Sequence, residues 1–593
     1  MTPVSQPDGK QMNAARWVPG ARRRLRISEL LKPSEKQAIL IWAGIAGMLA
    51  ALVSVGFRRL TEVLHAMLAG TEGNYVDTMA RLLWWQRIAI LAGGGLAASL
   101  VLKLFSRWTR RSAAGDYMEA ILVGDGVVPA RASIARSISA LFSISSGASI
   151  GREGPLVQLG AMMASLTARW RKFAPVKCRL LVACGAAGGI ASAYNAPIAG
   201  ALFVAEILLG TMAMETFGPL VFASVISTIV TRLWFGQQPL YQVPSIKLGS
   251  NWDFWPLLTL GITAGFAAPL FLKSLDLAGK PFARIPATLR PAVGGLLVGG
   301  LACYTTGICG NGHTVVDSLL NHRLLWHAVL TLFFLKWVAT CVTFGSGTVG
   351  GVFTPTLFLG ASLGSLTAAL CAPWWPGHLA EETFVLVGMG AFLAATTHAP
   401  IMAILMIFEM TLDYEAVLPL MLACVVAHQI SHGFHPKSIY AATLRRKGAN
   451  LFKSRLARLR ASDLLKPDPP RVDPSASFSV IAQMFITRPV TWIYVTRLDG
   501  TWLGGISLHD VKSFLQQSEL ASVVIASDIL RTDLPAVTAN DSMEQALEKF
   551  AGHEAEALPV LTNENQPKLT GSLSKNDLLL ALAERQTGSA KKQ

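Results

Sequence analysis

Apolar residues dominate the first 433 positions of the chain in long runs, and charged residues return in the remainder. Two early runs, 39–57 and 88–105, are long enough to cross a bilayer as helices, which takes roughly 20 residues. Later runs of the same character lie at 219–234, 255–272, 293–304 and 325–343. The pattern predicts an all-α domain that passes through a membrane several times.

Other apolar stretches are too short, or too interrupted by Gly, Ser, Asn and Pro, for plain membrane-spanning helices. They lie at 132–144, 156–166, 180–193, 198–209, 352–370 and 384–395. Broken helices are tolerated in lipid only where the freed backbone lines a cavity or is buried in protein. In transporters such interruptions often recur in two halves of the chain and mark the substrate site.

The interruptions of this chain do recur in two halves. The segment 195–206 matches 398–409, because both contain Ala-Pro-Ile and end on Glu at the same spacing. Upstream of each segment a proline opens a helix-like run, Pro155 in the first half and Pro355 in the second. We therefore predict two structural repeats that meet at the broken helices and cover about 39–235 and 254–433.

The charge of the chain supports a membrane location. Only 15% of the residues are charged, whereas a soluble domain has about 25%. The formal net charge is +16, and the basic residues cluster beside apolar runs, at 22–26, 107–111, 169–172 and 445–460. Basic clusters of this kind flank the cytoplasmic ends of membrane helices, so we expect both termini in the cytoplasm and no nucleic-acid partner. The N-terminus lacks the pattern of a cleaved signal peptide.

The polar tail contains a second, shorter repeat. Ala-Ser-Asp-Leu-Leu at 461–465 is echoed by Ala-Ser-Asp-Ile-Leu at 526–530, and each is followed by a helical pattern and strand-like runs. A unit of about 60 residues could hardly bury its own core, so the two should pack together. The predicted domains are a basic cytoplasmic tail (1–36), a membrane domain (37–447) and a cytoplasmic α/β pair (448–588, with units at 461–518 and 524–586).

The segment Gly151-Arg152-Glu153-Gly154-Pro155 places two charges inside apolar sequence, directly before a helix-like run. Its glycines allow the backbone to approach a ligand closely, and Pro155 suits the first turn of a helix. Helix N-termini present unpaired N–H groups and the positive end of the helix dipole, so they can hold an anion. The plainer alternative is that these Gly–Pro motifs only interrupt the chain between tightly packed membrane helices. We predict that this segment converges on an anion together with 345–355 and the loop 112–126.

Glu153 is an ionisable residue among apolar segments, where charged side chains are costly and usually functional. It would compete with an anion for one place, and its protonation would open the path. A pair with Arg152 is a weak alternative, since adjacent helical residues point apart. Glu206 and Glu409 are each consistent with two roles. One is to carry protons along a path, and the other is to form hydrogen bonds that support helix packing. Tyr440 is consistent with a hydroxyl that donates a hydrogen bond to the anion, or with an aromatic anchor at the membrane interface.

Nothing in the sequence indicates catalysis or metal binding. The seven cysteines are scattered in or near apolar segments, and no pair has the spacing of metal ligands. No nucleophile–base pair, metal-ligand cluster or phosphate loop is present. We therefore expect a protein that is not an enzyme and has no metal.

The motif at 151–155, Asn-Ala-Pro-Ile-Ala-Gly at 195–200, Gly-Gly-Val-Phe-Thr-Pro at 350–355 and Tyr440 together resemble the CLC family of chloride channels and chloride/proton antiporters. The resemblance covers roughly 39–445. It implies a CLC-type inverted repeat of tilted, broken helices, a homodimer with one anion pathway per subunit, and chloride as the transported ligand. It marks Glu153 as the gate, Tyr440 as the inner-gate tyrosine, and the anion-binding residues as Gly151, Arg152, Gly154, Pro155, Gly351, Val352 and Phe353.

The tail resembles a pair of cystathionine-β-synthase-type (CBS) domains, which some family members use to bind adenine nucleotides such as ATP, ADP or AMP. The resemblance implies that nucleotide ribose contacts Ser507, Asp510, Ser574 and Asp577. The same residues could instead cap helices. Apart from chloride and this nucleotide, we expect no cofactor.

Two departures from the family pattern keep alternatives open. The family's Gly-Ser-Gly-Ile-Pro motif, whose serine coordinates the central chloride, is absent from 112–129. The preference among chloride, nitrate and fluoride is therefore left open. The second glutamate of proton-coupled members aligns with Ile207, next to Glu206. We therefore expect anion transport in an inner or plasma membrane, as a passive channel or a proton exchanger. The alternative is a membrane sensor whose nucleotide-binding tail carries the output.

Overall fold

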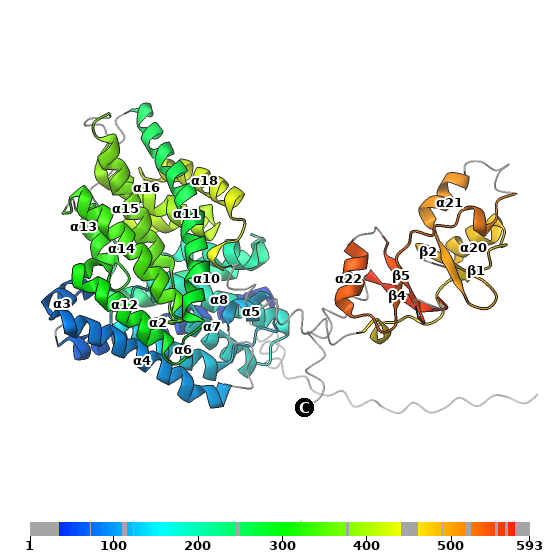
Figure 1. Ribbon diagram of the computed structural model, residues 1–593, viewed down its shortest axis with the longest axis horizontal. Helices are drawn as coiled ribbons and strands as arrows, with labels where there is room; N and C mark the ends of the chain where they lie inside the picture. The colour runs from blue at the N-terminus through cyan, green and yellow to red at the C-terminus, as the bar shows by residue number, and fades with distance from the viewer. Residues whose placement is uncertain are drawn as a thin grey trace, which may run out of the picture. The chain divides into compact units, whose positions relative to one another are not determined.

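The chain folds into a helical membrane domain and a small α/β tail, as the computed structural model in Figure 1 shows. The structure describes residues 35–70, 73–109, 116–122, 124–210, 212–243, 250–321, 323–374, 379–440, 460–488, 490–515, 523–551, 555–563 and 567–575. The fold class predicted from the sequence is therefore confirmed.

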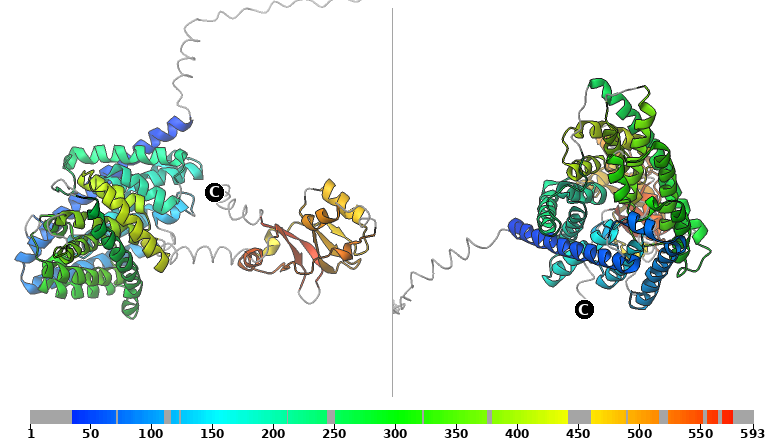
Figure 2. Two further views of the ribbon diagram at one scale, coloured as in Figure 1. Left: turned by 90° about the horizontal axis from the view of Figure 1, so that it is seen from above. Right: turned by 90° about the vertical axis from the view of Figure 1, so that its left-hand side faces the viewer.

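The apolar region consists of helices of very different lengths. They are α2 (Glu35–Ala69), α3 (Tyr75–Arg81), α4 (Trp84–Thr109), α5 (Tyr117–Leu122), α6 (Ala130–Ser145), α7 (Glu153–Trp170), α8 (Pro175–Tyr194), α9 (Pro197–Leu202), α10 (Met214–Phe235), α11 (Phe254–Phe282), α12 (Arg290–Tyr304), α13 (His313–Leu320), α14 (Trp326–Gly345), α15 (Phe353–Cys371), α16 (Glu381–Thr397), α17 (Pro400–Thr411) and α18 (Val417–Phe434). A π-helical segment, Phe203–Leu209, continues α9. Within the described residues, eight helices are long and apolar enough to cross a membrane. The helices cross one another at varied angles (Figure 2).

The helix α2 is longer than its apolar pattern predicts. The apolar run ends at 57, but α2 continues for three more turns to Ala69. Charged residues on this extension support each other along the helix, since Glu62 pairs with Arg58 at 3.2 Å and with Arg59 at 3.3 Å. Pairs at these spacings stabilise a helix slightly even where packing does not. Polar residues therefore extend α2 beyond the part that its apolar residues predict.

Glycines bring the broken helices of each repeat into close contact. A Cβ atom added at Gly160 on α7 would lie 2.4 Å from the Gly185 carbonyl oxygen on α8. In the second repeat, one added at Gly360 on α15 would lie 2.4 Å from the Gly388 carbonyl oxygen on α16. Small residues let helix backbones approach in this way inside membranes. The matching contacts support the two predicted repeats.

The backbone conformation is also the same at the two Ala-Pro-Ile motifs. Asn195 and His398, the residues before the two Ala-Pro-Ile words, both adopt the left-handed region with φ of 58°. Each ends one helix and lets the proline two residues later open the next, at Pro197 for α9 and Pro400 for α17. The left-handed residue and the proline explain why the apolar runs are broken at these places.

The described part of the tail contains two three-stranded sheets of identical topology. In the first, β1 (Arg471–Val472) runs parallel to β2 (Trp492–Thr496), which pairs antiparallel with β3 (Trp502–Ser507). In the second, β4 (Val537–Thr538), β5 (Ala557–Leu561) and β6 (Leu569–Ser574) pair in the same way. The helices α20 (Phe478–Thr487), α21 (Leu508–Leu515) and α22 (Met543–Ala551) accompany them.

The two units of the tail exchange their leading segments. Ala461, at the start of the first unit, is buried in the hydrophobic cluster of the second unit, and a bridge joins Lys466 to Ser572 of β6. Ala526 and Ile529, near the start of the second unit, are buried in the cluster of the first. Each unit therefore completes its core with a segment from the other.

Candidate functional site

The two repeats meet where Gly151 and Gly351 face each other. The Gly151 N–H donates to the Gly351 carbonyl oxygen at 2.6 Å, and the Gly351 N–H donates back at 2.8 Å. The helix α7 begins at Glu153 and the helix α15 at Phe353, each two residues after its paired glycine. This pairing brings the N-terminal ends of both helices to one place, as predicted for a shared anion site.

The side chain of Glu153 is buried at this junction, with 3% of its surface exposed. Its Oε1 accepts hydrogen bonds from the Tyr194 hydroxyl at 2.7 Å and from the Thr354 hydroxyl. Thr354 lies in the first turn of α15, so this carboxylate at the start of α7 contacts the starts of both helices. A negatively charged group thus lies where two helix dipoles present their positive ends.

The second oxygen of this carboxylate explains why both facing residues are glycines. A Cβ atom at Gly151 would lie 2.0 Å from Glu153 Oε2, and one at Gly351 would lie 2.5 Å from it. Any side chain at either position would occupy the place of the carboxylate. The structure thus brings together Gly151, Glu153 and Gly351, as the sequence predicts.

The other predicted residues of the two helix starts frame the same junction. Arg152 and Val352 are the N-cap residues of α7 and α15. Pro155 and Phe353 are buried in the first turns of these helices. Gly154 lies against the second repeat, because a Cβ atom there would be 3.4 Å from the Gly350 carbonyl carbon.

Arg152 also lines a cavity of about 510 Å³. The cavity is bounded by α2, by α3 and by the start of α13, and its charged walls carry three arginines against one glutamate: Arg58, Arg59, Arg152 and Glu62. His65 and His313 line it as well. A concave surface with an excess of one charge concentrates small ions of the opposite charge. The cavity would therefore concentrate anions around Arg152, the residue that precedes Glu153 in the chain.

Glu206 of the first repeat caps a helix of the second repeat, and Glu409 of the second repeat caps a helix of the first. Both oxygens of Glu409 accept backbone N–H groups at the start of α9, from Ile198 at 2.9 Å and Ala199 at 2.8 Å. Both oxygens of Glu206 accept N–H groups at the start of α17, from Ile401 at 3.3 Å and Met402 at 2.8 Å. The carboxylates satisfy N–H groups that helix starts leave unpaired. A proton path through Glu206 stays a prediction.

The remaining candidates of the membrane domain are less defined. Tyr440 is half-buried at the end of the described membrane region, and its role as an inner gate stays a prediction. The first part of the loop at 112–126, including residues 112–115, lies outside the described residues. The Tyr117 N–H beyond it donates to Gln158 Oε1 on α7 at 3.2 Å.

The candidates of the tail form a helix cap. The Ser507 hydroxyl donates to Asp510 Oδ2 at 2.6 Å, and the Asp510 N–H donates back to the Ser507 hydroxyl oxygen at 3.2 Å. Arg531 lies 3.4 Å from the same carboxylate. This is the capping arrangement given above as the alternative to ribose contacts. Ser574 ends β6, Asp577 lies outside the described residues, and a nucleotide site stays a prediction.

Sequence reasoning missed three polar groups in the membrane domain. Tyr194 and Thr354 were not expected to contact Glu153, although a hydroxyl at the edge of an apolar run could have drawn attention to each. Lys336 is fully buried in α14, and its Nζ donates to the carbonyl oxygens of Ile308 at 2.9 Å and Gly310 at 2.8 Å. A lysine inside a long apolar run is the signal that could have identified it.

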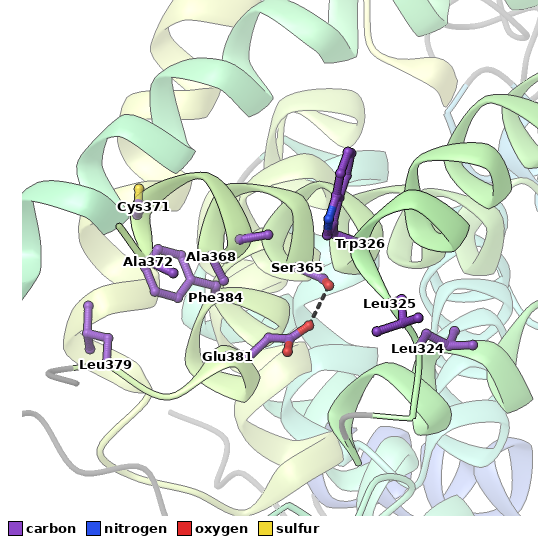
Figure 3. Close-up of a pocket in the computed structure, with 11 residues that line it drawn as sticks. Leu324, Leu325, Trp326, Ser365, Ala368, Cys371, Ala372, Leu379, Glu381 and Phe384 are labelled. Atoms are coloured by element: carbon purple, nitrogen blue, oxygen red, sulfur yellow. Dashed lines mark hydrogen bonds between the residues drawn. The ribbon is translucent and has the colours of Figure 1, made fainter. Parts of the chain in front are cut away.

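A second cavity, of about 320 Å³, lies elsewhere in the second repeat (Figure 3). Its walls are mainly apolar, and a hydrogen bond of 2.5 Å joins Ser365 to Glu381 in it. Ser365 follows Phe353 by 12 positions on α15, which is roughly 18 Å along a helix axis. This cavity is therefore separate from the Glu153 junction.

Comparison with known proteins places this geometry in a family. Residues 94–432 match the voltage gated chloride channel family, and residues 526–584 match the CBS domain. A chloride channel protein described as ClcB-like, from Ralstonia nicotianae, is 48% identical over 69% of this chain and 97% of its own length.

Two solved structures share the fold. A slow cyanobacterial Cl⁻/H⁺ antiporter superimposes with a TM-score of 0.62 at 25% identity, over 69% of this chain and 98% of its own. A eukaryotic CLC transporter superimposes with a TM-score of 0.59 at 17% identity, over 91% of this chain and 97% of its own. With its matching family model, its close relative and its two repeats meeting at Glu153, the chain is a multi-pass membrane protein that belongs to the voltage-gated chloride channel (CLC) family and carries a CBS tail.

Proposed function

We propose that this protein moves chloride or a similar monovalent anion across a membrane, along a path that Glu153 gates. The observation that carries the proposal is the carboxylate of Glu153, which is buried between the first turns of α7 and α15. These helix ends stabilise negative charge through N–H groups and dipoles, without a fixed cation that would trap an ion. Its relatives, a ClcB-like chloride channel protein and a slow cyanobacterial Cl⁻/H⁺ antiporter, agree with this use of the site.

Protonation is the step that opens the path. An ionised Glu153 has the charge of the transported anion and takes its place between the helix ends. A neutral carboxylic acid is held less strongly there, because it has lost its attraction to the helix dipoles. It then withdraws, and an anion from the arginine-lined cavity enters.

Two modes of transport fit the site. A passive channel needs only that Glu153 withdraw, whereas a proton exchanger also needs a route for the proton to the cytoplasm. Glu206 would be part of such a route, yet both of its oxygens cap α17. Purified protein in liposomes, with anion efflux and proton uptake recorded together, distinguishes the modes. Proton uptake against its gradient, driven by chloride, identifies an exchanger, and anion flux without proton movement identifies a channel. Absence of both would contradict the proposed function.

We further propose a homodimer in an inner or plasma membrane, with both termini in the cytoplasm and an adenine nucleotide at the tail. The basic clusters beside apolar runs support the orientation. Large apolar side chains exposed on α10 and α18, including Phe222, Ile229, Leu418 and Val425, fit contact with lipid or a second subunit. Cross-linking in native membranes tests the dimer, and calorimetry with ATP, ADP and AMP on the full chain tests the nucleotide.

A further inference from the structure

Three oxygen atoms from three separate elements meet at the gate. They are Glu153 Oε1 at the start of α7, the Tyr194 hydroxyl at the end of α8, and the Thr354 hydroxyl in the first turn of α15. Tyr194 donates to Glu153 Oε1 at 2.7 Å and lies 3.0 Å from the Thr354 hydroxyl, which donates to the same Oε1. The three side chains are buried, with 3–4% of their surface exposed. Water therefore has little access to these hydroxyls.

The chemistry of the three groups fixes their roles. An ionised carboxylate can only accept hydrogen bonds, and each hydroxyl has one proton to donate. Both hydroxyl protons are therefore directed at a single negatively charged point. A halide ion, or one oxygen of nitrate, is an acceptor of the same charge sign and can take the position of Oε1. The two donors then keep their function with a different acceptor.

The hydroxyls stay in place when the carboxylate moves. The Tyr194 ring packs against the Phe353 ring, with centroids 5.1 Å apart, and the left-handed Asn195 ends its helix directly behind it. Thr354 is held between Phe353 and Pro355 at the start of α15. Neither residue is on α7 with Glu153. Withdrawal of the carboxylate would let one hydroxyl donate to the other, which lies 3.0 Å away, but the second buried donor would have lost its acceptor. A buried donor without an acceptor is costly unless another acceptor replaces the carboxylate.

We propose that the Tyr194 and Thr354 hydroxyls are the specificity-determining donors of an anion subsite: they bind Glu153 Oε1 in the closed gate and bind the monovalent anion that replaces it in the open gate. The inference rests on the proposed function and deepens it, since it identifies residues that select the anion. It also supplies hydroxyl donors in a chain that lacks the Gly-Ser-Gly-Ile-Pro word at 112–129. The runner-up role is a clamp that only positions Glu153 and never contacts the transported ion.

The decisive test removes the gate first. In the Glu153→Ala background the carboxylate is absent, so any effect of the hydroxyls on anion affinity must be direct. Chloride and nitrate affinities of the purified protein are measured by titration calorimetry for Glu153→Ala alone and combined with Tyr194→Phe or Thr354→Val. We expect each combination to weaken chloride binding by about threefold to tenfold, the range for loss of one hydrogen bond. Unchanged affinity in both combinations would overturn the subsite.

Matched variants control for packing. Thr343→Val removes a buried hydroxyl on α14 that serves only the Ala339 carbonyl of its own helix, so it should leave chloride affinity unchanged. Thr354→Ser keeps the donor with less bulk and should restore the affinity that Thr354→Val loses. If Thr354→Ser binds as weakly as Thr354→Val, the effect is steric and the subsite is refuted.

A second measurement separates the clamp from the subsite. With Glu153 present, loss of either donor makes the ionised, closed gate less stable relative to the protonated one. The pH of half-maximal flux should therefore rise in Tyr194→Phe and in Thr354→Val. A rise without any loss of affinity in the Glu153→Ala background identifies the clamp and refutes the subsite. If Glu153→Ala itself neither binds nor passes anions, the proposed function fails, which is a different result.

Discussion

At the residue scale, the junction depends on the Glu153 side chain and equally on the lack of side chains at Gly151 and Gly351. Glu153 Oε2 lies where a Cβ atom of Gly151 or Gly351 would be. The glycines are therefore required by the closed gate and not only by the turn of the backbone. A larger residue at either position would change the gate before it changed the fold.

The first prediction follows from this contact. Gly351→Ala should displace the Glu153 carboxylate, because the new Cβ would lie 2.5 Å from Oε2. Anion flux at neutral pH should then rise severalfold and respond less to acid, as measured by chloride efflux from liposomes. Gly300→Ala is the control, since a Cβ at Gly300 meets nothing within 4 Å. Flux from Gly351→Ala with the normal pH response would show that Oε2 does not need this space.

The sequence was informative about Glu153 and uninformative about its donors, for a physical reason. A charge before a helix start in apolar sequence is a local signal, and it identified Glu153 together with its flanking glycines. The hydroxyl donors are 41 and 201 positions away in the chain. Only the packing of α8 and α15 around the junction brings them to the carboxylate, and local pattern does not contain that packing.

At the element scale, the two repeats are held together by exchanged helix caps. Glu409 of the second repeat caps α9 of the first, and Glu206 of the first caps α17 of the second. The matching words Ala-Pro-Ile and Glu predicted two equivalent elements. They could not tell whether each half caps itself or the other half, because both arrangements have the same sequence signature.

The second prediction concerns these caps. Glu409→Ala leaves the N–H groups of Ile198 and Ala199 without their acceptor, which should cost about 1–3 kcal/mol of unfolding free energy per buried group. Glu206→Ala should have a smaller effect at α17, because its hydrogen bond from Ile401 is longer and exposed to solvent. The midpoint of thermal unfolding in detergent should fall in both variants and stay constant in Glu415→Ala, whose side chain is exposed. A midpoint unchanged by both cap variants would show that the repeats do not depend on the exchange.

At the scale of the whole molecule, the tail and the membrane domain share one feature: each consists of two similar units that contribute residues to one another. Two units of the same topology each complete their core with a segment of the other, through Ala461 and through Ala526. The sequence predicted two units that pack together, since one could hardly bury its own core. The exchange of leading segments was not predictable, because the echoed Ala-Ser-Asp words are equally consistent with each segment packing on its own unit.

The third prediction uses a carboxylate of the tail. Partial burial by itself would raise the pKa of Asp541, but hydrogen bonds from Thr538 and Lys549 outweigh it and hold the pKa below its ordinary value. A carboxyl group with a depressed folded-state pKa contributes stability above its unfolded value of about 4 and loses it as the pH falls through the folded value. The second tail unit should therefore lose protection from hydrogen exchange below about pH 4.

Asp541→Asn provides the matched test. At neutral pH this variant should show faster hydrogen exchange in β4 and α22 of the full chain, because the charged acceptor of Lys549 is gone. At acid pH the difference from the wild type should vanish. Equal exchange at neutral pH would mean that Asp541 does not stabilise the tail.

The measurement that tests the central claim most directly is the pH dependence of chloride efflux from liposomes for the wild type and for Glu153→Gln. The claim is that an ionised Glu153 holds the anion's place between α7 and α15. Flux through the wild type should rise as the pH falls and Glu153 is protonated. Flux through Glu153→Gln, which resembles the protonated side chain at every pH, should already be high at neutral pH and nearly flat. An unchanged rise of flux with acid in Glu153→Gln would contradict the account.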